Sequence, residues 1–226
     1  MKKKFSIILV AVLLLSMGAL SCADSQDIPE AKIPGNKYLT LINKQSRLPE
    51  NWNFLFDFSV GKNALGELHI VESKALAAFE ALRTGLLETE GIQIELDSIY
   101  RSPEAQQDIW DSWLADPEKG PAYCELYLAP VGCSEHHTGL ALDIFLIRDG
   151  KSIRENDDMI ADREDFAVIH QYLARYGFIL RYPEGSSGIT GYPYEPWHLR
   201  YIDDPETAAY ITENNLTLEE YLDQNP

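Results

Sequence analysis

The chain has 226 residues, of which 45% are hydrophobic and 24% are charged, and its formal net charge is −17. This length and composition are typical of one globular domain with a sizeable core. The negative charge excludes a nucleic-acid-binding protein, which needs basic patches, and it argues against docking on anionic lipid through charge.

The first residues predict export. Three lysines at positions 2–4 precede an apolar run over residues 5–20, a pattern typical of a secretory signal peptide. Cys22 follows Gly-Ala-Leu-Ser, which resembles a bacterial lipobox whose cysteine becomes lipidated. The alternatives are ordinary secretion, to the periplasm or the medium, and an uncleaved anchor. We therefore expect a signal peptide over residues 1–21, a flexible tether over 22–37 and one domain over 38–226.

Helical and strand patterns alternate through the first half of the domain. Residues 38–44 predict an extended segment, and the aromatic-rich residues 52–60 predict packing over the domain edge. Residues 68–71 read as a strand. Apolar residues then recur at three- and four-residue spacing, which predicts a helix over 72–90, and residues 92–99 alternate as a strand.

The next helix start places a cationic residue where functional groups often collect. Ser102 can cap a helix and Pro103 suits its first position, so we expect a helix over residues 103–114. Arg101 stands at the strand end facing this helix start. Residues 116–131 are rich in Pro, Gly and Tyr and predict an irregular loop.

Two cysteines frame the end of that loop. In an oxidising compartment Cys124 and Cys133 could form a disulfide that closes a short loop next to Ser134. The alternative is a pair of reduced, buried thiols. Two cysteines are too few for a zinc site built from cysteine alone.

Residues 134–143, which read Ser-Glu-His-His-Thr-Gly-Leu-Ala-Leu-Asp, are the centre of the pattern. They hold His136 and Asp143, two residue types that bind zinc, with a glycine between them. Residues 144–147 are an apolar β-forming run, so a loop bearing His136 should enter a buried strand that begins near Asp143. His137 is the alternative ligand, but the spacing favours His136.

The second half of the chain predicts short elements and a second motif. The expected elements are a helix within residues 157–176, a strand at 178–182, a mobile loop at 183–194, a strand at 197–202, and helices at 205–211 and 217–222. No internal repeat and no second domain are evident.

The second motif, Glu-Pro-Trp-His, completes a catalytic donor set. Two histidines and one carboxylate, with a position left for water, are the composition of a catalytic zinc site, so we take His136, Asp143 and His198 as ligands. Glu195 stands three residues before His198, near enough to act as the base. Arg101 is the candidate partner for a developing oxyanion. This layout predicts zinc-assisted peptide-bond hydrolysis.

These residues carry a resemblance to a known family. The spacing Ser134-x-His136-x-x-Gly139-x-Ala141-x-Asp143, followed by Glu195-x-x-His198, resembles the motifs of the LAS zinc peptidases (lysostaphin, D-Ala-D-Ala enzymes, sonic hedgehog). More narrowly, the chain resembles the VanY-type D-alanyl-D-alanine carboxypeptidases and their L,D-carboxypeptidase relatives over residues 38–202. Supporting pieces are Leu41-Ile42-Asn43-Lys44, Leu48-Pro49, Tyr100-Arg101-Ser102 with Gln106, and the residues from Glu195 to Tyr201.

The resemblance implies a fold, a cofactor and roles. It implies an α+β fold in which a small antiparallel sheet carries a zinc site and is flanked by helices. It also implies one zinc ion (Zn2+), bound by His136, Asp143 and His198, with Glu195 as the base and Arg101 as the transition-state stabiliser. Ser134 and Gln106 would lie near the terminal residue of the substrate.

The implied substrate is a peptidoglycan stem peptide that loses its C-terminal D-alanine. D,D-carboxypeptidase activity on a pentapeptide is favoured, and L,D-carboxypeptidase activity on a tetrapeptide is the alternative. Tyr192, Tyr194 and Trp197 are candidates for shaping the pocket or for ordinary packing. An alternative of another class is a non-catalytic, zinc-containing module that binds the cell wall. The oligomeric state stays open.

Overall fold

The computed structural model describes residues 27–50 and 52–225. The predicted signal peptide, the predicted lipidation site Cys22 and the first part of the predicted tether lie outside the described residues. Among the helices of the described residues, none is both long and apolar enough to cross a membrane.

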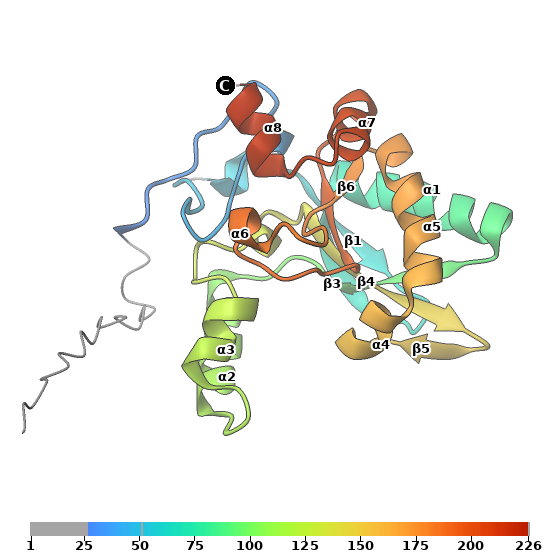
Figure 1. Cartoon of the computed structure of the whole chain (residues 1–226), viewed down its shortest axis with the longest axis horizontal. Helices are drawn as coiled ribbons and strands as arrows, with labels where there is room; N and C mark the ends of the chain where they lie inside the picture. Colours follow the sequence, from blue (N-terminus) through green and yellow to red (C-terminus); the bar gives the residue numbers. More distant parts are fainter. Residues whose placement is uncertain (1–26, 51, 226) are drawn as a thin grey trace, which may run out of the picture.

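A five-stranded antiparallel sheet forms the centre of the molecule (Figure 1). Its strands run in the order β3-β4-β7-β6, and β5 pairs with β4 beside this path. The strands are β3 (Gln93–Ser98), β4 (Ala141–Arg148), β5 (Lys151–Ile153), β6 (Phe178–Leu180) and β7 (His198–Tyr201). Together with the flanking helices, this sheet confirms the predicted α+β class.

Helices cover the sheet on the side of the main core. Helix α1 (Ser73–Glu90) contacts β3, and α5 (Arg163–Leu173) contacts both α1 and β6. The buried residues of α1 are Ala75, Phe79, Leu82 and Leu86, at the spacing that places side chains on one helix face. They join a core that also holds Phe145 of β4 and Phe166 of α5. This packing holds the central strands rigidly in place.

Two helices form a separate projection from the sheet. Helix α2 (Pro103–Ala115) and helix α3 (Gly120–Tyr127) pack against each other and extend away from the strands (Figure 1). The Oγ of Ser102 accepts a hydrogen bond from the backbone N–H of Ala105, as expected for the helix cap. Trp110, Cys124 and Leu128 form a small core of their own inside this pair.

The remaining elements are short. They are the hairpin β1 (Phe58–Lys62) and β2 (Leu68–Glu72), the helices α4 (Asn156–Ala161), α6 (Ser187–Thr190), α7 (Pro205–Glu213) and α8 (Leu218–Gln224), and the 3₁₀ turns η2 (Lys37–Leu39), η3 (Trp52–Phe54), η4 (Glu135–Thr138) and η5 (Ala174–Tyr176). The helices predicted near residues 205 and 217 are thus confirmed as α7 and α8.

Several predicted elements differ from the structure. The loop predicted at residues 116–131 contains α3, because Cys124 and Leu128 find apolar partners on α2. The helix predicted within 157–176 is divided at Asp162, whose backbone leaves the helical region and whose carboxylate pairs with Arg148. The mobile loop predicted at 183–194 contains α6. Strands β1 and β5 were not predicted, and the extended segment at 38–44 is instead a turn and an isolated bridge.

Part of the predicted tether is docked on the domain. Glu30 pairs with Arg47 as a β-bridge and through a salt bridge of 2.7 Å. The backbone N–H of Ala31 donates to Arg47 O at 2.7 Å, and the Ala31 side chain is buried. Residues 29–31 were predicted to belong to a flexible tether. In the structure they are fixed to the domain, because the backbone of Arg47 forms hydrogen bonds with their backbone.

Cys124 and Cys133 are both buried, and no disulfide bond joins them. Cys124 packs between α2 and α3, whereas Cys133 packs with Tyr182 and Tyr192. The structure therefore agrees with the alternative of two reduced, buried thiols.

Candidate metal centre

The 3₁₀ turn η4 positions His136, the first histidine of the site. The Oγ of Ser134 accepts a hydrogen bond from the backbone N–H of His136 at the start of η4. Gly139 ends the turn with φ at 68°, in the left-handed region that favours glycine. A Cβ atom at Gly139 would also lie 2.9 Å from the backbone nitrogen of Glu72. The motif glycine is thus required both by its φ angle and by close packing.

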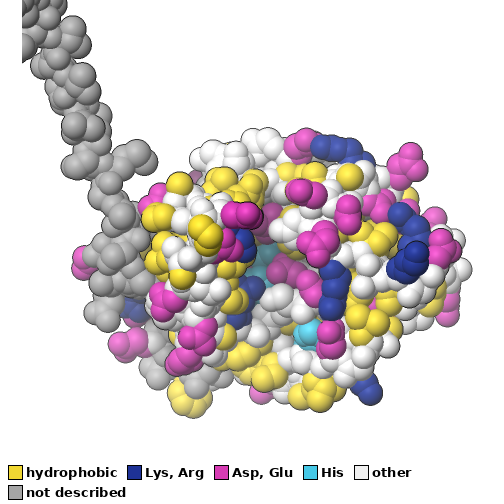
Figure 2. Space-filling model, turned by 90° about the horizontal axis from the view of Figure 1, so that it is seen from below, with side chains coloured by type: hydrophobic (Ala, Val, Ile, Leu, Met, Phe, Trp, Pro, Cys, Tyr) yellow, Lys and Arg dark blue, Asp and Glu magenta, His cyan; other side chains and the backbone are white. Residues whose placement is uncertain are grey.

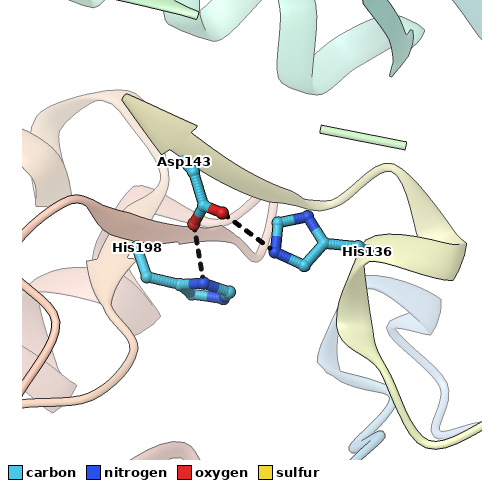
Figure 3. A group of neighbouring side chains, drawn as sticks. All are labelled: His136, Asp143 and His198. Atoms are coloured by element: carbon cyan, nitrogen blue, oxygen red, sulfur yellow. Dashed lines mark ion pairs between the residues drawn. The ribbon is translucent and has the colours of Figure 1, made fainter. Parts of the chain in front are cut away.

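Strand register brings the other two candidate ligands together. β4 and β7 are antiparallel, and their register sets Asp143 directly opposite His198. Figure 3 shows the Asp143 carboxylate between the two imidazole rings. Its Oδ2 lies 3.3 Å from His136 Nε2, and its Oδ1 lies 2.9 Å from His198 Nδ1. One ligand atom from each residue fits within 4.8 Å of the others.

The structure distinguishes His136 from its neighbour His137. His136 Nδ1 lies 2.7 Å from Ile99 O, which leaves Nε2 directed at Asp143. In His137, Nδ1 lies 2.7 Å from Arg101 O and Nε2 accepts a hydrogen bond from the Gly132 N–H at 3.1 Å. Both nitrogens of His137 are therefore occupied by the backbone, and the geometry favours His136 as the ligand.

The buried polar atoms of this group fit a cation. Within the described residues, Asp143 Oδ1 is buried without a hydrogen-bond partner, and it lies 2.9 Å from His198 Nδ1. Burial alone would raise the pKa of Asp143, but the two histidines lower it below its usual range. Burial would lower the pKa of His198, but Asp143 raises it to about 9. Two ring nitrogens and a carboxylate oxygen are a donor set that suits zinc.

Glu195 lies beside the three candidate ligands. Its Oε2 is 3.7 Å from His198 Nδ1, and its backbone N–H donates to Tyr182 O. Burial raises the pKa of the Glu195 carboxyl to about 7, although His198 acts in the opposite direction. A carboxylate with such a pKa can both accept and return a proton near neutral pH.

The predicted cationic group is held next to this carboxylate. Arg101 Nη1 donates to Gln106 Oε1 at 2.8 Å, and Nη2 donates to Ser98 Oγ at 3.0 Å. Gln106 is only 1% exposed, and its amide nitrogen donates to Ala129 O. Gln106 therefore lies behind Arg101 rather than on the cavity surface, whereas Ser134 and Arg101 line the cavity.

The three candidate ligands line a cavity of about 350 Å³. Figure 2 shows histidine and acidic side chains inside this hollow, with hydrophobic side chains gathered along one side. Tyr192 and Trp197 line the cavity as the sequence suggested, whereas Tyr194 is absent from its lining. One side, which we call the aromatic wall, comes from α2 and α3 and consists of Ile109, Trp113, Tyr123 and Tyr127.

A lysine joins the aromatic wall to the opposite side of the cavity. Lys44 Nζ donates to Glu125 O at 2.6 Å, at the end of α3, and to Gly191 O at 2.8 Å. The same nitrogen lies 3.9 Å from the ring centroid of Tyr192. The motif around Asn43 and Lys44 thus has a structural role near the site.

Sequence reasoning missed two residues that contact His198. The ring of Tyr182 packs against the His198 ring at a tilt of 43°, with 4.7 Å between the ring centroids, and Glu135 Oε2 lies 3.7 Å from His198 Nε2. The helix that carries Tyr123 and Tyr127 of the aromatic wall was also missed, because residues 116–131 were predicted as a loop. The one available signal was Glu135 itself, a carboxylate inside the first motif next to His136.

The chain is similar to known proteins over most of its described length. A family model described as VanY, D-alanyl-D-alanine carboxypeptidase, matches residues 68–204. The chain is 42% identical over 134 residues to the bifunctional D-Ala-D-Ala dipeptidase and D-Ala-D-Ala carboxypeptidase VanXYC of Enterococcus gallinarum. This match covers 58% of the chain and 66% of that protein, so the chain spans about two thirds of the relative's length.

Two solved structures are similar over most of the chain. The LdcB LD-carboxypeptidase is 30% identical with a TM-score of 0.69, and the match covers 88% of this chain and 95% of that one. A D,D-pentapeptidase VanY from a VanB-type vancomycin resistance cassette, in complex with Zn(II), is 31% identical with a TM-score of 0.62. That match covers 82% of this chain and 98% of the other.

Proposed function

Because the chain belongs to the VanY family of D-alanyl-D-alanine carboxypeptidases, we propose that it is a zinc-dependent carboxypeptidase that removes the C-terminal D-alanine from peptidoglycan stem peptides. The observation that carries the proposal is the convergence of His136, Asp143 and His198 within 4.8 Å, at the bottom of a cavity that Glu195 also lines. Zinc-dependent peptide hydrolysis needs a metal and a proton carrier, and both have candidate residues here.

His136 Nε2, His198 Nδ1 and the Asp143 carboxylate would hold one zinc ion. When bound, zinc supplies a water of lowered pKa, about 7, and polarises the scissile carbonyl. Glu195 takes the proton from the attacking water and returns it to the nitrogen of the leaving D-alanine. The raised pKa of Glu195, about 7, suits both transfers.

Arg101 supplies the positive charge at the cavity surface. Gln106 and Ser98 hold its guanidinium in one orientation, so little reorganisation is needed when negative charge develops on the substrate. Ser134 also lines the cavity and would contact the terminal residue of the peptide. Gln106 would act on that residue through Arg101, because its side chain is buried.

D,D-carboxypeptidase activity on a pentapeptide stem is the favoured specificity, in line with the family description and the similarity to VanXYC. The second candidate is L,D-carboxypeptidase activity on a tetrapeptide stem, which the similarity to the LdcB LD-carboxypeptidase supports. Both reactions use the same metal chemistry and differ in how the pocket places the scissile bond.

Mass spectrometry of zinc-loaded protein incubated with each stem peptide tests the proposal. Loss of one alanine from the pentapeptide alone is the expected result. Loss from the tetrapeptide alone would replace it with the L,D specificity. If neither peptide is cleaved while zinc is bound, the alternative of a zinc-containing cell-wall-binding module would be favoured instead.

For location, we propose an exported protein that is held at the membrane by lipid at Cys22. The support is the lysine-rich start and apolar run over residues 2–20 and the lipobox-like residues before Cys22. Labelling of the full chain with a fatty-acid analogue in a bacterial host tests this. Label that remains on a Cys22→Ser variant would contradict lipidation at that residue.

A further inference from the structure

Glu135 has a buried carboxylate in which one oxygen accepts hydrogen bonds and the other has no hydrogen-bond partner among the described residues. It directly precedes His136, and only 2% of its surface is exposed. Its Oε1 accepts hydrogen bonds from Arg181 Nε and Arg200 Nη1, each at 2.8 Å. Its Oε2 is buried and has no hydrogen-bond partner among the described residues. That open oxygen lies 3.7 Å from His198 Nε2, which is likewise buried and unpaired there.

The carboxylate is held in place by a buried ion network. Arg181 also donates to both carboxylate oxygens of Glu219, at 2.8 and 2.7 Å. Arg200 Nη2 donates to Tyr38 O at 2.8 Å and to Thr40 O at 2.9 Å. Glu135, Arg181 and Arg200 are therefore buried together behind the candidate ligand His198, and the partly buried Glu219 pairs with Arg181. Such networks often contribute little net stability relative to apolar packing, so their position needs another explanation.

The orientation of His198 supplies that explanation. Its Nδ1 faces the metal position, 2.9 Å from Asp143 Oδ1, while its Nε2 faces Glu135. A histidine that binds a metal offers the lone pair of one nitrogen, and the other nitrogen then carries the proton and donates it to a nearby acceptor. A carboxylate in that place fixes the tautomer and the ring orientation and makes the ligand more basic.

We propose that Glu135 is the positioning residue of His198: its Oε2 accepts the Nε2 proton and keeps Nδ1 directed at the zinc site. Arg181 and Arg200 hold Oε1 and so prevent the carboxylate from turning away. The inference rests on the proposed zinc function. It gives a role to Glu135, Arg181, Arg200 and Glu219, which the peptidase mechanism itself does not use.

The two histidine ligands are held in different ways. His136 Nδ1 contacts the carbonyl oxygen of Ile99, a neutral acceptor, at 2.7 Å. His198 instead faces a carboxylate that is anchored by two guanidinium groups. Only the second acceptor belongs to a side chain, so it can be removed by substitution without altering the backbone.

The variant Glu135→Gln tests the proposal because it keeps the shape of the side chain. The amide oxygen must face Arg181 and Arg200, which places the amide NH2 group opposite the His198 Nε2–H. Two donors then face each other, and His198 loses the acceptor that sets its tautomer. We expect the dissociation constant for zinc to rise about 10- to 100-fold, measured by competition with a chromophoric chelator.

Glu95→Gln is the matched control. Glu95 is 4% exposed and pairs with Arg83 at 3.1 Å, but it contacts none of the candidate ligands. Both variants replace a buried, arginine-paired carboxylate, so both should lose some stability in thermal melts of the metal-free protein. Only Glu135→Gln should weaken zinc binding, and an equal weakening in Glu95→Gln would mean that the effect is merely structural.

Nitrogen NMR of the histidine rings gives a second, independent readout. In the zinc-loaded wild-type protein we expect the His198 Nε2 to carry a proton that exchanges slowly with water, and Nδ1 to carry none. A wild-type spectrum without this proton would overturn the proposal, even if Glu135→Gln fails to fold. A folded Glu135→Gln variant with wild-type zinc affinity would overturn it as well.

These measurements separate the inference from the proposed peptidase activity. Zinc affinity and the protonation of His198 are observed without any substrate. If the wild-type protein binds zinc with a protonated Nε2 but cleaves no stem peptide, the positioning role stands and the proposed activity fails.

Discussion

The floor of the cavity, formed by His136, Asp143, His198 and Glu195, is held differently from the aromatic wall. The floor lies on β4, β7 and the segments next to them, with the buried ion network behind it. The aromatic wall lies on α2 and α3, which form a small core separate from the main one. Polar contacts such as Gln106 to Ala129 O and Lys44 to Glu125 O tie this pair of helices to the body.

We expect this difference to separate chemistry from substrate selection. Reacting groups must be held closely in place, and the antiparallel strands and buried ion pairs supply that rigidity. A wall with its own small core can change its side chains or shift slightly without disturbing the ligands. We therefore expect changes in the floor to affect zinc binding and turnover, and changes in the wall to affect mainly KM.

The largest expected effect tests whether the floor of the cavity binds the metal, on which the contrast between floor and wall depends. Asp143→Ala leaves two histidines as the only protein ligands, so we expect loss of zinc and a more than about 10⁴-fold drop in turnover. Elemental analysis of zinc per chain and a stem-peptide assay measure this. Asp97→Ala, which changes another carboxylate of the cavity lining, should keep its zinc. Full zinc occupancy in Asp143→Ala would refute the ligand assignment.

The next largest effect should separate catalysis from metal binding inside the floor. Glu195→Gln removes the proton carrier, so kcat should fall about 10²- to 10⁴-fold while zinc content stays at the wild-type level. Glu184→Gln, an exposed position before the second motif, should retain wild-type kcat. Comparable rates for Glu195→Gln and the wild type would assign the base to another residue.

A smaller effect should arise on the aromatic wall. Trp113→Ala removes apolar contact area for the peptide, and we expect KM to rise about tenfold with kcat changed less than about threefold. Leu114→Ala, an exposed neighbour outside the cavity lining, serves as the control and should leave both constants unchanged. A fall in kcat as large as that of Glu195→Gln would show that the wall and the floor are not independent.

The smallest effect should come from the connection between the two sides. Lys44→Met removes the hydrogen bonds to Glu125 O and Gly191 O and the cation over the Tyr192 ring. We expect KM to rise about threefold and zinc affinity to stay constant. The control is Lys151→Met, an exposed lysine on β5. Weaker zinc binding in Lys44→Met would mean that the connection also supports the floor.

Sequence reasoning succeeded where the signal is local. Helix α1 followed from apolar spacing along 18 residues and from Gly91 at its end, and the structure places Gly91 in the left-handed region. The start of α2 followed from Ser102 and Pro103, which act on the backbone within one turn. Such contacts join residues three or four positions apart, so the sequence displays them directly.

Sequence reasoning failed where contacts with distant segments decide the local conformation. Helix α3 is stabilised because Cys124 and Leu128 pack against Trp110 of α2. No pattern within residues 116–131 predicts this contact with α2. The division between α4 and α5 depends on Asp162, which pairs with Arg148 on β4. Tyr182 was assigned to a strand, and only the folded chain places its ring on His198.

The sequence by itself determined the candidate ligands and base, since spacing and residue type sufficed to single out His136, Asp143, His198 and Glu195. Only the tertiary structure decided that Asp143 faces both histidines, that Gln106 lies behind Arg101, and that Glu135 stands behind His198. The reason is physical: Glu135 and Arg200 are 65 residues apart in the chain, and only the paired strands bring them into contact.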